Sequence, residues 1–239
     1  MILDLYGKKF DTERPESTFA NGDCVEAMKK FSDKYFDLAI VDPPYGDGGG
    51  TFLGGNGSRF GGRFDRYKDS TSTDGKPERR QIDWDTVPSD DYFRELFRVS
   101  KNQIIWGGGN YFRLPPTRCF VIWRKISISE NFSMAMAEYA WTSFNDNAKV
   151  FDFVPNSTKE KRFHPTQKPI ELYEWLLNRY AKPGDLILDT NVGSASSLIA
   201  CNETGHKYVG FEISKDYYDK AVKRVAEYGA QMTIFDLQN

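Results

Sequence analysis

Residues 186–201 read LILDTNVGSASSLIAC, and this stretch decides the fold. An apolar run ends on Asp189, a turn containing Gly193 follows, and a helical pattern begins among serines. A strand that passes through a glycine turn into a helix is typical of ligand-binding α/β domains. The turn lacks the Gly-Lys-Ser/Thr ending of a phosphate-binding loop, so the stretch predicts a nucleoside site at most.

Apolar runs and helical patterns alternate along the rest of the chain. The patterns predict strands over 36–42, 102–110, 118–125, 137–144, 186–190, 207–214 and 232–236, and helices over 90–100, 169–181, 196–205 and 215–229. Ser89 or Asp90 caps the first helix, and Gly205 and Gly229 end the last two. This alternation predicts an α/β domain with a mostly parallel sheet and helices on both faces.

Composition excludes several classes of protein. A chain of 239 residues fits one domain, here 1–239, and no apolar run approaches the ~20 residues that cross a membrane. The first residues lack the layout of a signal peptide, so we expect a cytoplasmic protein. Three cysteines far apart argue against a disulfide framework, and two histidines leave no zinc-ligand spacing, so we expect no metal.

One segment has no apolar period. Residues 46–80 are rich in glycine and arginine, and we interpret them as a mobile loop. The net charge is −2, so the overall charge gives no sign of nucleic-acid binding. Basic residues nevertheless cluster locally, and such patches can attract a polyanion. The alternative for each single cluster is an ordinary solvent-exposed surface without a binding role.

The tetrapeptide Asp42-Pro43-Pro44-Tyr45 closes the strand predicted over 36–42. Two prolines fix the backbone and remove N–H donors, so the Pro43 carbonyl remains as a rigid acceptor. Asp42 adds a second acceptor and Tyr45 a flat ring, which together suit a planar amine. The alternative is a plain tight turn, because Asp-Pro often opens turns.

Acids and glycines follow the other predicted strands as well. Asp42, Gly107–Gly109, Asp189 and Glu212 all come directly after apolar runs. Ligands of such sheets bind at the carboxyl ends of the strands, where an acid often takes the hydroxyls of a ribose. Glu212 is placed for that role, and its alternative is a surface acid.

The motifs together resemble a known family. The matching segments are FANGDC (19–24), DPPY (42–45), WGGGNYF (106–112), AWTSF (140–144), HPTQKP (164–169), DTNVGSAS (189–196) and GFEIS (210–214). In this order they resemble DNA amino-methyltransferases whose catalytic motif precedes the cofactor motif, a group associated with restriction–modification. The likeness spans roughly residues 19 to 228. It implies one Rossmann-like methyltransferase domain with a seven-stranded twisted sheet and an antiparallel edge strand.

The resemblance also implies a cofactor, S-adenosylmethionine. The residues expected to bind it are Asp23, Cys24, Asp42, His164, Thr166, Gln167, Lys168, Asp189, Asn191, Gly193, Ser194, Glu212 and Ile213. Asp23 would lie beside the adenine, Glu212 would take the ribose hydroxyls, and Lys168 would supply a cation for the methionine carboxylate. The family usually has Phe at Asn191 and Gly at Ala195, so we expect altered cofactor affinity.

The implied reaction is methylation of the N6 amine of adenine in double-stranded DNA. Asp42, Pro43, Pro44 and Tyr45 would be the catalytic residues, with Tyr45 stacking on a base flipped out of the duplex. An Asp at the first motif position favours adenine N6, and cytosine N4 is the alternative. A non-catalytic DNA-binding homologue and a protein or RNA methyltransferase also stay open.

Target recognition would fall within 124–163. Such a short insert implies a short target, relaxed specificity or help from a second subunit in a homodimer.

Overall fold

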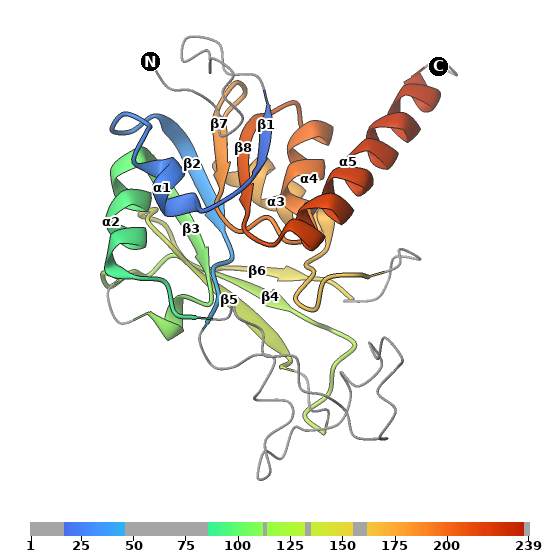
Figure 1. Cartoon of the computed structure of the whole chain (residues 1–239). Helices are drawn as coiled ribbons and strands as arrows, with labels where there is room; N and C mark the ends of the chain where they lie inside the picture. Colours follow the sequence, from blue (N-terminus) through green and yellow to red (C-terminus); the bar gives the residue numbers. More distant parts are fainter. Residues whose placement is uncertain (1–16, 46–85, 112–113, 132–134, 155–161, 237–239) are drawn as a thin grey trace, which may run out of the picture.

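The computed structural model describes residues 17–45, 86–111, 114–131, 135–154 and 162–236 (Figure 1). Within these ranges one sheet of eight strands forms in the order β1-β8-β7-β2-β3-β5-β4-β6. The strands are β1 (Thr18–Asn21), β2 (Phe36–Val41), β3 (Ser100–Trp106), β4 (Phe120–Arg124), β5 (Ala137–Thr142), β6 (Lys149–Asp152), β7 (Leu186–Asp189) and β8 (Lys207–Glu212).

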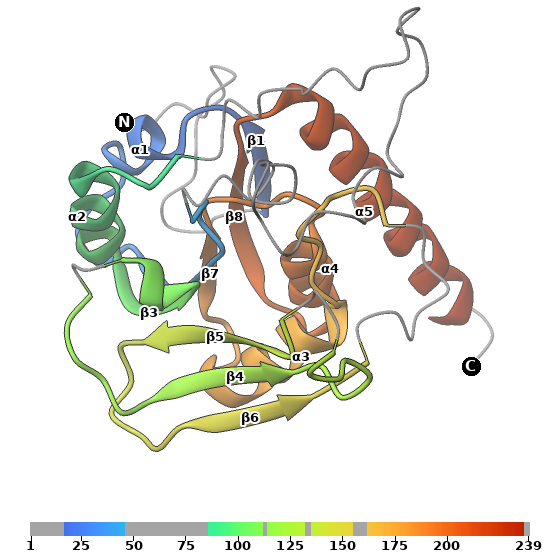
Figure 2. The same ribbon diagram turned by 90° about the horizontal axis from the view of Figure 1, so that it is seen from below.

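Helices cover both faces of this sheet (Figures 1 and 2). They are α1 (Cys24–Met28), α2 (Asp90–Val99), α3 (Ile170–Tyr180), α4 (Ser196–Glu203) and α5 (Lys215–Asp236), with a 3₁₀ turn η2 (Gly108–Asn110) after β3. Of the described helices, none has the length and apolar character that a membrane span needs.

Alternate residues of the central strands face opposite layers of the core. Leu38 and Ile40 of β2 pack in the cluster that includes α3 and α4, whereas Ala39 and Val41 pack in the cluster that includes α1 and α2. This period of two follows from the pleat of a strand, which points successive side chains to opposite faces. The near-continuous apolar runs of the sequence are therefore strands buried on both sides.

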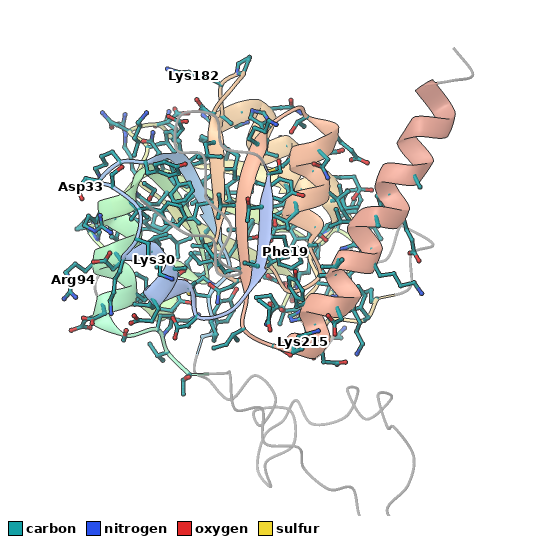
Figure 3. The ribbon with its side chains drawn as sticks, turned by 45° about the horizontal axis from the view of Figure 1, so that its top comes forward. Phe19, Lys30, Asp33, Arg94, Lys182 and Lys215 are labelled. Carbon is teal, nitrogen blue, oxygen red and sulfur yellow. The ribbon has the colours of Figure 1, made fainter. Side chains whose placement is uncertain are left out.

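The strand order points to a ligand crevice at the ends of β2 and β7. These two strands are parallel neighbours, and the next strands along the chain, β3 and β8, lie on their outer sides. Such a reversal of strand order leaves a gap at the carboxyl ends of the strands, where open α/β sheets bind ligands. Lys182, just before β7, and Lys215, just after β8, mark the two ends of the strands on opposite sides of the molecule (Figure 3).

The Rossmann-like fold and the mostly parallel sheet are confirmed, with two corrections. The described sheet has eight strands, not seven, because the short strands β1 and β6 pair at its two edges. The antiparallel strand, β5, is not at an edge but lies between β3 and β4. The chain passes from β3 to β4 and returns as β5 between them, and β6 then pairs with the other side of β4.

The C-terminal prediction was wrong. Helix α5 continues through Gly229 to Asp236, so residues 232–236 form helix and not a strand. A Cβ added at Gly229 would meet no atom within 4 Å, and nothing in the local packing forces the helix to stop there. An isolated glycine lowers helix propensity by about 1 kcal/mol, which tertiary context readily overcomes.

Two predicted segments fare differently. The glycine- and arginine-rich loop at 46–80 lies outside the described residues. Within 124–163, strands β5 and β6 belong to the main sheet. Target recognition by this range stays a prediction.

Candidate active site

Asp42 lies just past the end of β2 and is bonded through both of its oxygens. The hydroxyl of Tyr45 donates to Oδ1 at 2.8 Å, and the ammonium of Lys168 donates to Oδ2. These contacts join the tetrapeptide at 42–45 to the motif at 164–169, which the sequence separates by more than a hundred residues. Burial and the neighbouring Asp42 raise the pKa of Tyr45 well above its usual value, so its hydroxyl stays protonated.

Lys168 continues into a larger set of charges. Its ammonium lies 3.3 Å from Oε2 of Glu138 on β5, and Lys125 donates to Oε1 of the same carboxylate at 2.5 Å. We call Asp42, Lys168, Glu138 and Lys125 the charged network. Burial alone would lower the pKa of Lys168, but Asp42 and Glu138 raise it above its ordinary value. Burial pushes the pKa of Glu138 upward, yet Lys168 and Lys125 hold it below its ordinary value.

Lys168 has partners other than the one that the resemblance implied. The resemblance assigned it to a methionine carboxylate, but its ammonium pairs with Asp42 and Glu138. Asp42 follows β2 and Glu138 lies on β5. Lys168 therefore enters the surroundings of Asp42.

Tyr111 fixes the two prolines. Its hydroxyl, which is buried, contacts the carbonyl oxygen of Pro43 at 2.8 Å and that of Pro44 at 3.1 Å. Each carbonyl oxygen has two lone pairs, so acceptor capacity remains at both. The Tyr45 ring packs against Gly107, where a Cβ would collide with it, and Gly107 has a φ of 68°. Glycine is needed here for both reasons.

Asp189 ends β7 and is buried. Its Oδ2 accepts from the hydroxyl of Ser197 at the start of α4, and its Oδ1 accepts from the backbone N–H of Asn191 at 3.0 Å. Burial raises the pKa of Asp189 to about 7, although both hydrogen bonds act in the opposite direction. The side chain of Asn191 turns to Thr190, whose hydroxyl donates to Oδ1 at 2.8 Å.

Glu212 ends β8 and holds the glycine turn. The backbone N–H of Gly193 donates to its Oε2 at 2.9 Å, and that of Ser214 donates to its Oε1 at 2.8 Å. Burial raises the pKa of Glu212 above its ordinary value. Gly193 has a φ of 54°, and a Cβ there would lie 3.2 Å from the ring of His164. The turn and the motif at 164–169 are thus in contact.

The imidazole of His164 is uncharged at neutral pH. Burial, with Lys168 and Arg162 nearby, lowers the pKa of His164 to about 4. Its ring lies 4.4 Å from that of Tyr217, and its Nδ1 is 3.2 Å from the hydroxyl of Thr166. His164 therefore offers a neutral ring beside the glycine turn.

The motif at 164–169 is fastened to the start of α4. The hydroxyl of Ser196 donates to the carbonyl of Lys168 at 2.7 Å, and the buried Arg224 donates to the carbonyl of Ser194 at 2.6 Å. The carbonyl of Gln167 accepts from Arg162 at 2.8 Å. Ala195, where the family usually has glycine, has a left-handed φ of 63°. A non-glycine residue in this region carries about 1–2 kcal/mol of strain.

The residues around β1 complete the row of strand ends. The carboxylate of Asp23 caps α1, accepting from the N–H groups of Val25 at 2.7 Å and Glu26 at 3.2 Å. Burial raises the pKa of Cys24 to about 12, so this thiol is not a nucleophile at neutral pH. The side chain of Ile213 is exposed.

The sequence interpretation missed several residues of this region. Glu138 and Lys125 of the charged network, Tyr111, and Arg224 were not predicted as site residues. Glu138 had a usable signal, since an acid stands inside the otherwise apolar strand AEYAWT. Within the described ranges, no group of three or more His, Cys, Asp or Glu side chains is arranged to hold a metal ion.

Comparison with known proteins bears on this geometry. Residues 121–223 match the model of a DNA methylase family that covers N6 and N4 enzymes. The type II methyltransferase M.HinfI of Haemophilus influenzae is 25% identical over 258 residues, covering 88% of this chain and 68% of that protein. The type II methyltransferase M2.LlaDCHI of Lactococcus lactis subsp. cremoris is 24% identical over 268 residues, covering 91% and 93%.

Solved structures share the fold. M1.HpyAVI in its complex with SAM gives a TM-score of 0.54 at 19% identity, covering 87% of this chain and 98% of that one. The cytosine-N4-specific PvuII DNA methyltransferase gives a TM-score of 0.56 at 12% identity, covering 89% and 92%. Residues 121–223 are thus similar to the N6/N4 DNA methylase family, and most of the chain is similar to two type II methyltransferases.

Proposed function

We propose that this protein transfers a methyl group from S-adenosylmethionine to the N6 amine of adenine in double-stranded DNA. The observation that carries the proposal is the arrangement around Asp42. A carboxylate and the rigid carbonyl of Pro43 stand together at the end of β2, beside the aromatic ring of Tyr45. Such a group suits a planar heterocycle that carries an exocyclic amine.

The other half of the crevice fits the cofactor. Asp189 and Glu212 end the neighbouring strands β7 and β8, and carboxylates complement an amino group and ribose hydroxyls. Gly193 lets the backbone turn tightly beside His164. When bound, S-adenosylmethionine supplies an electrophilic methyl group on a sulfonium. The proposed binding residues are Asp23, Cys24, His164, Thr166, Gln167, Asp189, Asn191, Gly193, Ser194, Glu212 and Ile213.

The catalytic residues would act by positioning. An exocyclic amine is a poor nucleophile because its lone pair is delocalised into the ring. Hydrogen bonds to Asp42 and to the Pro43 carbonyl orient the two N–H groups and localise that lone pair on nitrogen. Nitrogen then takes the methyl group in line, the S–C electron pair returns to sulfur, and the surplus proton of the amine passes to water. Fixed orientation of this kind contributes several kcal/mol to lowering a barrier.

Access to the base requires its removal from the duplex. An amine inside a stacked pair cannot reach the crevice, so the base must be flipped out of the helix, as the general behaviour of DNA methyltransferases illustrates. Tyr45 provides the ring on which the flipped base stacks. The connections beside β5 and β6 are the segments we propose for target recognition.

The test is methyl transfer from labelled S-adenosylmethionine to unmethylated duplex DNA, with the product nucleoside identified by mass. Wild type should yield N6-methyladenine, and Asp42→Asn should lose at least ~100-fold in rate, because an amide cannot supply the same acceptors. Asp33→Asn, whose exposed carboxylate pairs with Arg98 at 2.8 Å, is the matched control and should retain its rate.

Other outcomes have clear meanings. N4-methylcytosine as product would keep the mechanism and overturn the base assignment, in line with the fold shared with a cytosine-N4-specific enzyme. Label in protein or RNA but not in DNA would overturn the substrate class. No transfer and no thermal shift with the cofactor would leave a non-catalytic DNA-binding homologue.

A further inference from the structure

The charged network alternates in sign and crosses four parts of the fold. Asp42 follows β2, Lys168 precedes α3, Glu138 lies on β5 and Lys125 follows β4. The Lys168 side chain is only 2% exposed and that of Lys125 only 7%. Lys168 is the member that touches both carboxylates, because its ammonium contacts Asp42 on one side and Glu138 on the other.

Burial of an ammonium is unfavourable without compensating partners. A buried charge is retained in proteins when it is paired and hydrogen-bonded. Here two carboxylates supply the pairing, and the Trp106 ring lies 5.2 Å from Nζ of Lys168. Lys125 is placed similarly, 4.8 Å from the ring of Trp123. The fold therefore holds a cation beside Asp42 at a position where an apolar side chain would be buried without the desolvation cost of a charge.

The consequence for Asp42 is geometric. With Oδ2 held by Lys168 and Oδ1 in contact with the Tyr45 hydroxyl, the carboxylate has a fixed plane. A carboxylate that could rotate would present its acceptor lone pairs in many directions. Lys168 is held in turn by Glu138, whose own orientation depends on Lys125.

We infer that Lys168 is a positioning residue for Asp42 in methyl transfer, and that Glu138 positions Lys168. This inference rests on the proposed function. It differs from the role suggested by the sequence, in which Lys168 would bind the methionine carboxylate of the cofactor. The positioning role predicts a loss in kcat, whereas the methionine-carboxylate role predicts a loss in affinity for the cofactor.

The decisive experiment is a double-mutant cycle on the full chain with Lys168→Met and Asp42→Asn. At saturating cofactor and DNA, Lys168→Met should lower kcat on the order of 100-fold, the usual cost of a small misplacement. The KM for DNA and the Kd for S-adenosylmethionine, measured by calorimetry, should stay within about threefold of wild type. Adding Lys168→Met to Asp42→Asn should cause little further loss, because residues that act as a unit are not additive.

Two other variants sharpen the test. Lys125→Met removes a second buried ammonium, which contacts Glu138, and it should lower kcat by less than Lys168→Met does. Glu138→Gln keeps the shape of the side chain and should lower kcat about tenfold with unchanged cofactor Kd. Glu138→Gln tests the inference if Lys168→Met fails to fold.

The outcomes separate the inference from the proposed function. A wild type that labels no DNA overturns the proposed function. An active wild type whose Lys168→Met variant keeps its kcat overturns the inference alone. A Lys168→Met variant that keeps kcat but loses cofactor affinity supports the methionine-carboxylate role and also overturns the inference. Additive losses in the cycle would mean that Lys168 acts on stability and not through Asp42.

Discussion

The hydroxyl of Tyr111 contacts the carbonyl oxygen of Pro43 at 2.8 Å and that of Pro44 at 3.1 Å. Tyr111 lies just beyond η2, so the turn after β3 holds the tetrapeptide after β2. Proline fixes its own φ but not the ψ that directs its carbonyl, so the contacts with Tyr111 complete the rigidity of these two acceptors. One phenol thus sets the direction of two acceptors.

Replacing Tyr111 with Phe should therefore affect both stability and rate. Loss of the hydroxyl should lower the free energy of unfolding by about 1 kcal/mol, the usual net value of a hydrogen bond. The methyl-transfer rate should also fall, because the Pro43 carbonyl loses its partner. Urea unfolding and single-turnover kinetics measure the two effects.

The control for this variant is Tyr218→Phe. The Tyr218 hydroxyl donates to the carbonyl of Phe19 at 3.3 Å, away from the tetrapeptide. This substitution should lower stability slightly and leave the transfer rate unchanged. Equal rates for Tyr111→Phe and wild type would contradict the role given to Tyr111.

Substitution of Gly107 should disable the site. In Gly107→Ala the new Cβ would collide with the Tyr45 ring, and the backbone would be strained at a φ of 68°. We expect the transfer rate to fall on the order of 100-fold, because Tyr45 must move. Gly184→Ala is the matched control, since Gly184 has a φ of 87° with no atom within 4 Å. It should lose stability but retain activity.

Two exposed glycines should respond to alanine with opposite signs. Gly205 has a φ of 72°, so Gly205→Ala should lower the free energy of unfolding by about 1 kcal/mol. Gly229 lies inside α5, and Gly229→Ala should raise it by about 0.5–1 kcal/mol. A Cβ meets no atom within 4 Å at either position, so the backbone alone decides the sign. Thermal or urea unfolding measures both, and changes of the same sign would refute this account.

Asp189 should make stability depend on pH. Burial raises the pKa of Asp189 to about 7, above its value in the unfolded chain, so the folded protein holds this proton more tightly. Its contribution to stability is therefore greatest below about pH 4, and it is lost as the pH rises from about 4 to about 7. Asp189→Asn has no such proton to lose.

The measurement is the difference in free energy of unfolding between wild type and Asp189→Asn across this pH range. The free energy of unfolding of wild type should fall relative to that of Asp189→Asn as the pH rises. Burial also raises the pKa of Glu203 to about 7, but Glu203 is present in both proteins and its effect cancels. A difference that does not change with pH would contradict the prediction.

The sequence predicted the central elements of the fold because their patterns are strong. The buried run over 36–42 and the amphipathic pattern over 90–100 correspond to β2 and α2, and Ser89 caps that helix as expected. Strands β1 and β6 have four residues each and α1 has five, too few for a period to be recognised. Gly229 predicts a helix end, but a glycine ends a helix only where the fold uses its left-handed backbone conformation.

The site was predicted unevenly for a related reason. Asp42, Asp189 and Glu212 could be proposed from the sequence because each lies at or just after the end of a strand. The partners of Lys168 could not be predicted, because Asp42 and Glu138 lie far from it in sequence and only the fold brings them into contact. Tyr111 was quoted within a motif, yet only the folded turn after β3 shows that its hydroxyl reaches Pro43.

The pairing of β1 with β8 has a consequence for biosynthesis. Asn21 aligns with Glu212, a partner 191 residues later in the chain. Ribosomes deliver chains from the N-terminus at about 5–20 residues per second, so the first strand must wait about 10–40 seconds before its neighbour is made. The stretch that carries Asp23 is therefore translated long before its neighbouring strand can pair with it. Contacts of such long sequence separation also slow folding, and a C-terminal truncation before β8 would leave this edge without its template.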